Sequence, residues 1–147
     1  MPSSAVLTKP YLRKVLVGKP AGPSESRVVE NVRLLLDNFL SDDILGYKTF
    51  HGEIKIDEFE LEVVNPSLDK AIARGGDVIL IPLFGWNVEG YRLGRGGGFY
   101  DRLLKAVPDM IAIGVGSQYR MVDFQAEEHD VRMDIIVTDV REILYTV

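Results

Sequence analysis

The feature that most constrains the fold is a continuous apolar run, DVILIPL, at residues 77–83 of this 147-residue chain. Strands of a parallel sheet that is covered on both faces have this pattern. A second such run occupies residues 111–115, after a segment with helical spacing at Leu103 and Leu104 that ends at Pro108. Strand, loop, helix and strand in this order predict a βαβ unit with a parallel pair of strands.

The rest of the chain alternates between helix and strand signals. Apolar residues recur at helical spacing in three further segments, 8–16, 24–40 and 68–73. Strand signals cover 44–50, 134–138 and 143–147, with weaker ones over 54–63. We therefore expect one domain over residues 1–147, an α/β fold built as a three-layer α/β sandwich with a mostly parallel sheet.

The composition argues against several classes of binding partner and site. The net charge of −5 and the pI near 5.0 argue against a nucleic-acid or membrane-surface binder, because phosphate backbones favour a broad basic face. The chain has no cysteine, which excludes disulfides and thiolate metal sites and fits a reducing compartment. No apolar run reaches membrane-spanning length. We expect a cytoplasmic protein that is a monomer, with a dimer as the alternative.

A glycine- and arginine-rich segment, RLGRGGGFYDR at residues 92–102, follows the first apolar run. Glycine lets successive backbone N–H groups point at one anion, and arginine offers a charged fork for phosphate or carboxylate oxygens. Counting from Gly94, Phe99 stands where a dinucleotide fingerprint needs its last glycine, and no P-loop Gly-Lys-Ser/Thr follows. Ligands of open parallel sheets bind beyond the carboxyl ends of the strands, so we predict an anion site here. A tight solvent-exposed turn is the alternative.

This segment, together with more distant residues, resembles the 5-formyltetrahydrofolate cyclo-ligase family, also called 5,10-methenyltetrahydrofolate synthetases. The resemblance is specific between Asp77 and Asp139 and looser before that. It rests on the following residues: Pro82, Gly90, the whole of 92–102, Gly114, Gln118, His129, Asp130 and 134–138, with Lys9, Arg13, Gly52 and Glu53 as looser matches.

The resemblance implies an enzyme of one-carbon metabolism. ATP would phosphorylate the formyl oxygen of 5-formyltetrahydrofolate, the N10 nitrogen would attack the activated carbon, and phosphate would leave to give 5,10-methenyltetrahydrofolate. The catalytic residues would be Arg95, Lys9 and Arg13. ATP would contact Lys9, Arg13, Arg92, Leu93, Gly94, Arg95, Gly96, Gly97, Gly98, Phe99 and Tyr100. The folate would contact Glu53, Arg95, Gly96, Gly97, Gly98 and Phe99.

Magnesium is the expected cofactor, with Asp101 as its ligand by resemblance and Asp134 as a second candidate. One carboxylate together with phosphate oxygens and waters commonly holds this ion. Both Asp101 and the other polar candidates have simpler explanations. Asp101 could favour the positive end of its helix, Lys9 and Arg13 could form one solvated helix face, and Glu53 could belong to an exposed acidic surface with Asp57, Glu58, Glu60 and Glu62.

Two departures from the family pattern keep other functions open. The chain is shorter than usual members between Glu53 and Asp77, at residues 54–76, and Asn87 stands where they often have aspartate. A relative that binds nucleotide or folate without turnover is one alternative. Another is a different phosphate-handling enzyme, such as a sugar-phosphate isomerase, on a similar frame.

Overall fold

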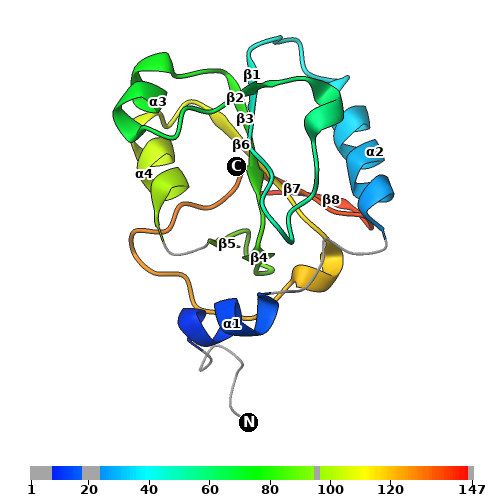
Figure 1. Ribbon diagram of the computed structural model, residues 1–147, viewed down its shortest axis with the longest axis vertical. Helices are drawn as coiled ribbons and strands as arrows, with labels where there is room; N and C mark the ends of the chain where they lie inside the picture. Colours follow the sequence, from blue (N-terminus) through cyan, green and yellow to red (C-terminus); the bar gives the residue numbers. More distant parts are fainter. Residues whose placement is uncertain (1–7, 18–23, 95–96, 146–147) are drawn as a thin grey trace.

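A six-stranded sheet forms the middle layer of the protein, as the computed structural model shows for residues 8–17, 24–94 and 97–145 (Figure 1). The strand order is β2-β1-β3-β6-β7-β8, and every neighbouring pair is parallel except β7 with β8. The strands span Ile44–Gly46 (β1), Glu62–Val63 (β2), Val78–Pro82 (β3), Ile111–Val115 (β6), Ile135–Val137 (β7) and Glu142–Leu144 (β8). This confirms the α/β class and the mostly parallel sheet.

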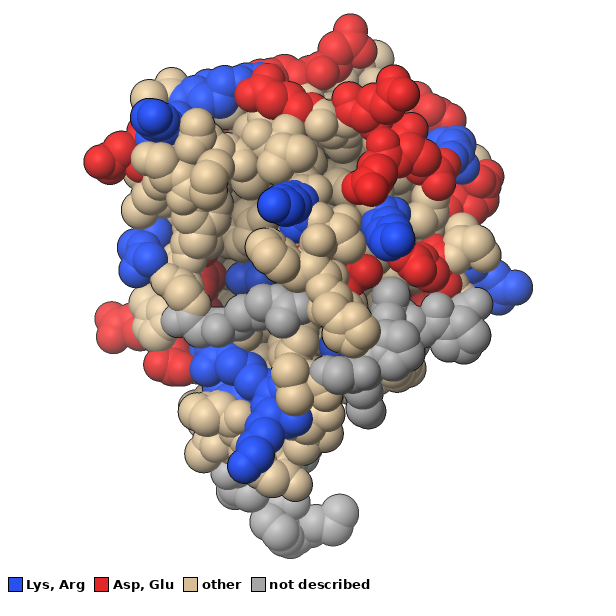
Figure 2. Space-filling view, viewed as in Figure 1, with Lys and Arg blue, Asp and Glu red and all other residues tan. Residues whose placement is uncertain are grey.

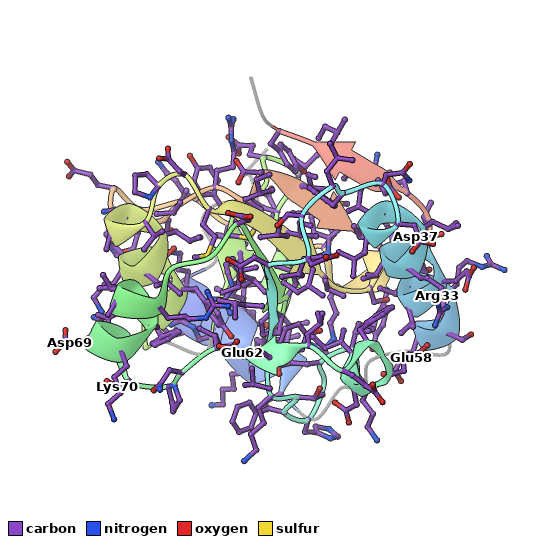
Figure 3. All side chains as sticks on the ribbon, turned by 90° about the horizontal axis from the view of Figure 1, so that it is seen from above. Arg33, Asp37, Glu58, Glu62, Asp69 and Lys70 are labelled. Carbon is purple, nitrogen blue, oxygen red and sulfur yellow. The ribbon has the colours of Figure 1, made fainter. Side chains whose placement is uncertain are left out.

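Helices cover both faces of the sheet. One face carries α3 (Leu68–Arg74) and α4 (Phe99–Ala106), and the other carries α2 (Glu25–Leu36), as the view from above shows (Figure 3). Strand β3 divides its buried side chains between the two sides: Ile79 and Ile81 join the core under α3 and α4, whereas Val78 and Leu80 join the core under α2. The alternation follows from the two-residue period of a strand, so the apolar run supplies two cores at once.

A third apolar cluster contains residues of helix α1 (Lys9–Leu16) and lies outside the six-stranded sheet. Between β3 and α4 the chain forms a small antiparallel hairpin, β4 (Gly85–Trp86) with β5 (Arg92–Leu93). Leu12 and Leu16 of α1 pack with Phe84, Leu93 and Phe124. The helix therefore lies below this hairpin, next to the segment that leads into the glycines (Figure 1).

Three of the predicted elements differ from the structure. Helix α2 ends at Leu36 instead of Leu40, because the Asn38 side chain donates to the Leu34 carbonyl and the backbone turns, which leaves Leu40 exposed. The strand expected over residues 44–50 stops at Gly46. The weak extended signals over 54–63 form a 3₁₀ turn and the two-residue strand β2. No pattern in the sequence predicted the β4–β5 hairpin.

Charged side chains fasten the surface elements. Arg74 of α3 pairs with Asp43 before β1 and with Glu62 of β2, and this guanidinium lowers the pKa of Asp43. On the opposite side Arg33 of α2 pairs with Glu58 (Figure 3). Acidic residues crowd the upper edge of the face in Figure 2. No helix in the described part of the chain has the length and apolar character that crossing a membrane requires.

Glycines after β6 allow the close packing at the carboxyl edge of the sheet. A Cβ on Gly116 would lie 2.7 Å from the Leu83 Cβ, so Gly116→Ala should lower the free energy of unfolding by about 1–3 kcal/mol through overpacking. The matched control is Gly97→Ala, because a Cβ there meets no described atom within 4 Å. Urea unfolding of both variants tests this. Equal stability of the two would contradict the packing at Leu83.

Candidate functional site

The glycine segment lies between the hairpin and helix α4. Strand β5 ends at Leu93, and α4 begins at Phe99 with Gly98 at its N-cap in the left-handed region at φ 69°. Arg102 in the first turns of α4 donates from its guanidinium to the Gly97 carbonyl at 2.6 Å. The predicted residues Arg95 and Gly96 lie outside the described residues, whereas Gly94, Gly97 and Gly98 frame them on both sides.

Two arginines from different elements reach Gly94. Arg13 of α1 donates from Nε to the Gly94 carbonyl at 2.8 Å. Arg92 donates to the Pro82 carbonyl from Nε at 3.3 Å and from a terminal nitrogen at 3.2 Å, and its guanidinium lies 5.0 Å from the centre of the Tyr100 ring. A Cβ on Gly94 would come within 2.7 Å of a terminal nitrogen of Arg92, so a larger residue here would displace this guanidinium. Positive charge is thus concentrated at the start of the segment.

Lys9 has a different neighbourhood from Arg13. Its amine pairs with Asp130 and with Glu127, the latter at 3.0 Å, and it lies 5.7 Å from the centre of the Phe124 ring. The Asp130 carboxylate also accepts from the Glu127 backbone N–H and so holds this acidic turn together. Helix α1 therefore brings Arg13 to the glycine segment but directs Lys9 to the turn at 127–130.

Glu53 is buried, with 5% of its surface exposed, unlike the acidic residues that follow it. Its Oε1 accepts from the Phe50 backbone N–H at 2.8 Å, and Tyr47 donates from its hydroxyl to the Ile54 carbonyl at 2.7 Å. These bonds hold the turn that follows β1. The simpler explanation of Glu53 as part of an exposed acidic surface is therefore wrong.

Two phenols near Glu53 stay protonated at neutral pH. Burial raises the pKa of Tyr100 to about 12, with Arg92 lowering it and the Glu53 charge raising it. Burial, and after it the Glu53 charge, holds the pKa of Tyr47 well above its usual range. Tyr100 also packs edge-on against Phe99, with ring centroids 5.2 Å apart, and both rings contact the core under α4.

A single cavity of about 190 Å³ joins Glu53 to the glycine segment. The described residues that line it are Lys48, Phe50, Glu53, Pro82, Arg92, Gly97, Gly98, Phe99 and Tyr100. An apolar cavity of about 390 Å³ shares Lys48, Phe50, Phe99 and Tyr100 with it. The structure thus brings together predicted site residues that are more than 40 positions apart in the sequence.

Several residues of this region were not predicted from the sequence. Lys48 and Phe50 line the cavity, but a predicted strand over 44–50 gave no reason to place them there. Arg120 is buried and donates to the Phe84 carbonyl at 2.8 Å, and no pattern in the sequence indicated this burial.

The hairpin gives Asn87, the departure from the family pattern, a structural role. Its side-chain amide donates to the Phe124 carbonyl and accepts from the Glu89 and Tyr91 N–H groups.

The two predicted magnesium ligands differ in their surroundings. Asp101, in the first turn of α4, accepts from the Val131 N–H through Oδ1 at 3.0 Å, next to the glycine segment. Asp134 accepts from the Ala112 N–H through Oδ2 at 2.8 Å and so extends the pairing of β6 with β7. Among the described residues no three histidines or carboxylates gather as a metal cluster. Asp101 fits an ion held chiefly by phosphate oxygens and water. Both Asp101 and Asp134 stay predictions as magnesium ligands.

A sequence model of the 5-formyltetrahydrofolate cyclo-ligase family matches residues 41–139, more than half of the chain. The chain belongs to this family. Curated 5-formyltetrahydrofolate cyclo-ligases from Mycoplasma pneumoniae, Mycoplasma genitalium and Mycolicibacterium smegmatis are 42%, 24% and 38% identical to it over 43%, 90% and 63% of the chain. These matches cover 39%, 76% and 50% of the relatives, so two of the three span half of the relative or less.

Solved structures agree with the fold of the cyclo-ligase family. A 5,10-methenyltetrahydrofolate synthetase from Mycoplasma pneumoniae superposes with a TM-score of 0.74 at 24% identity, covering 90% of this chain and 99% of that one. One from Aquifex aeolicus superposes with a TM-score of 0.71 at 20% identity, covering 93% and 92%. At these identities the likeness concerns the fold alone.

The structural role of Asp101 as an acceptor can be tested without any metal. Asp101→Ala should lower the free energy of unfolding by about 1–2 kcal/mol, because the Val131 N–H loses its acceptor. Asp101→Asn is the matched control, since its amide oxygen can still accept this bond, and it should lose much less. Thermal unfolding at equal protein concentration provides the comparison. An equal loss in both variants would show that the negative charge, rather than the acceptor, stabilises this position.

Proposed function

We propose that this protein converts 5-formyltetrahydrofolate to 5,10-methenyltetrahydrofolate at the expense of ATP. The observation that carries the proposal is the cavity in which buried Glu53 faces the glycine segment. A pterin presents N–H groups that a buried carboxylate can accept, and a triphosphate needs the N–H groups and arginines that the glycine segment supplies. Family membership supports the pairing of these two ligands.

In this reaction the residues of the chain would position the two substrates and neutralise the charge of the phosphates. Glu53 would hold the pterin, while Phe99 and Tyr100 would contact the folate and the nucleotide. Arg13, Arg92 and Arg95 would stabilise the charge that develops as the γ-phosphoryl group moves to the formyl oxygen, which is the main requirement of phosphoryl transfer. N10 of the folate would then attack the activated carbon, and phosphate would leave.

Asp101 would hold magnesium together with the phosphate oxygens, and the ion would supply further neutralisation of the triphosphate. Lys9 would join the phosphates only by exchanging its partner Asp130 for them. We also propose that the protein acts in the cytoplasm as a monomer, in keeping with its acidic charge and lack of cysteine.

A relative that binds both ligands without turnover is the second candidate. The observation in its favour is the ion pair that holds Lys9 at Asp130 instead of at the glycine segment. Calorimetry would then detect uptake of ATP or folate, whereas no product would form. A sugar-phosphate isomerase is less consistent with the family match over residues 41–139.

An absorbance assay tests the activity. Purified protein given 5-formyltetrahydrofolate, ATP and magnesium should develop the near-ultraviolet band of the methenyl product, and omission of ATP should abolish it. Arg95→Ala should lower kcat about a hundredfold, because a charge that stabilises the transferring phosphoryl group contributes a few kcal/mol to the barrier. The control, Arg27→Ala on the exposed side of α2, should keep normal turnover.

Two results would count against parts of this proposal. Folded protein without any ATP-dependent signal would eliminate the enzyme and leave the binder. Near-normal turnover by Arg95→Ala would remove Arg95 from the mechanism and leave the activity intact.

A further inference from the structure

Lys48 occupies an unusual place among the cations of the protein. It follows β1 by two residues, and it lines both the cavity that contains Glu53 and the apolar cavity next to it. The apolar cavity is lined by Lys48, Phe50, Val63, Val64, Pro66, Phe99 and Tyr100. Lys48 is thus the only charged side chain among the described residues that line this cavity.

The surroundings of Lys48 suit an anion at the end of an apolar group. Among the described residues no carboxylate forms an ion pair with its amine, and the residue is exposed to solvent. Phe50 is 58% exposed and Val63 is 50% exposed, so apolar surface lies open beside the amine. An aromatic ring that carries a carboxylate would cover this surface and place its charge at the lysine.

The proposed substrate has this sequence of groups: a pterin, then an aminobenzoyl ring, then a glutamate with two carboxylates. With the pterin at Glu53, the ring can lie in the adjoining apolar cavity that shares Phe50, Phe99 and Tyr100. We propose that Lys48 binds the glutamate carboxylate of the folate and sets the preference of the site for substrates with that tail. This inference rests on the proposed function, because it requires the pterin at Glu53.

Lys55 provides a matched control. It lines the larger, more open cavity together with Lys48, at about 790 Å³, but it lines neither the apolar cavity nor the one with the glycine segment. Acidic residues, Glu25 and Asp57, line that larger cavity too. Loss of the Lys55 charge should therefore leave the folate tail unaffected, although both lysines lie close in the sequence and carry the same charge.

The experiment compares two ligands and four proteins by calorimetry. The ligands are 5-formyltetrahydrofolate and its 5-formyltetrahydropteroyl amide, which keeps the pterin and the ring but lacks the glutamate. Lys48→Met should weaken binding of the folate about tenfold, as expected for loss of one charge-assisted hydrogen bond, and should not change binding of the amide. Lys48→Arg should retain most of the affinity. Lys55→Met should bind both ligands like the unaltered protein.

Failure of this inference and failure of the proposed activity give different results. An equal loss for both ligands, or a rise in the KM for ATP without a change in folate affinity, would overturn the role of Lys48 in binding the tail. Turnover by the unaltered protein would stand regardless. Tail-dependent binding through Lys48 without any turnover would keep the inference and eliminate the activity. If the unaltered protein binds neither ligand, both fail.

Discussion

The pairing of β3 with β6 is the constraint on which the rest of the structure depends. Five residue pairs join Val78–Pro82 to Ile111–Val115 in parallel, and the alternate side chains of β3 supply the cores under α2 and under α3 and α4. Parallel strands require a crossover connection, and here that connection contains the hairpin, the glycine segment and α4. The residues predicted to bind phosphate therefore lie in the crossover connection that the parallel pairing of β3 and β6 requires.

The candidate site depends on two segments that meet from different parts of the chain. The turn after β1 carries Glu53, and the crossover carries Arg92 and the glycines, so the cavity exists only when β1 lies beside β3. Helix α1 adds Arg13 from outside the sheet through its bond to Gly94. Folding thus brings a buried carboxylate and the glycine segment together in the lining of one cavity.

Sequence patterns predicted the elements whose signals are local and strong. The runs at 77–83 and 111–115 could be predicted as strands because buried strands have no polar interruptions. The hairpin was missed because strands of two residues have no measurable period. The family resemblance suggested Glu53 as a site residue. Its burial could not be predicted, because the four acidic residues that follow it in the sequence favour an exposed surface. Lys48 was missed for a different reason: its place at three cavities depends on where β1 ends.

The central claim is that the Glu53 cavity holds the folate while the glycine segment holds the triphosphate. A crystal structure with 5-formyltetrahydrofolate, magnesium and a non-hydrolysable ATP analogue tests it most directly. The account predicts the pterin in hydrogen-bonding contact with the Glu53 carboxylate and the phosphates against residues 94–98. A folate bound away from Glu53, or a triphosphate that does not contact the glycine segment, would contradict it.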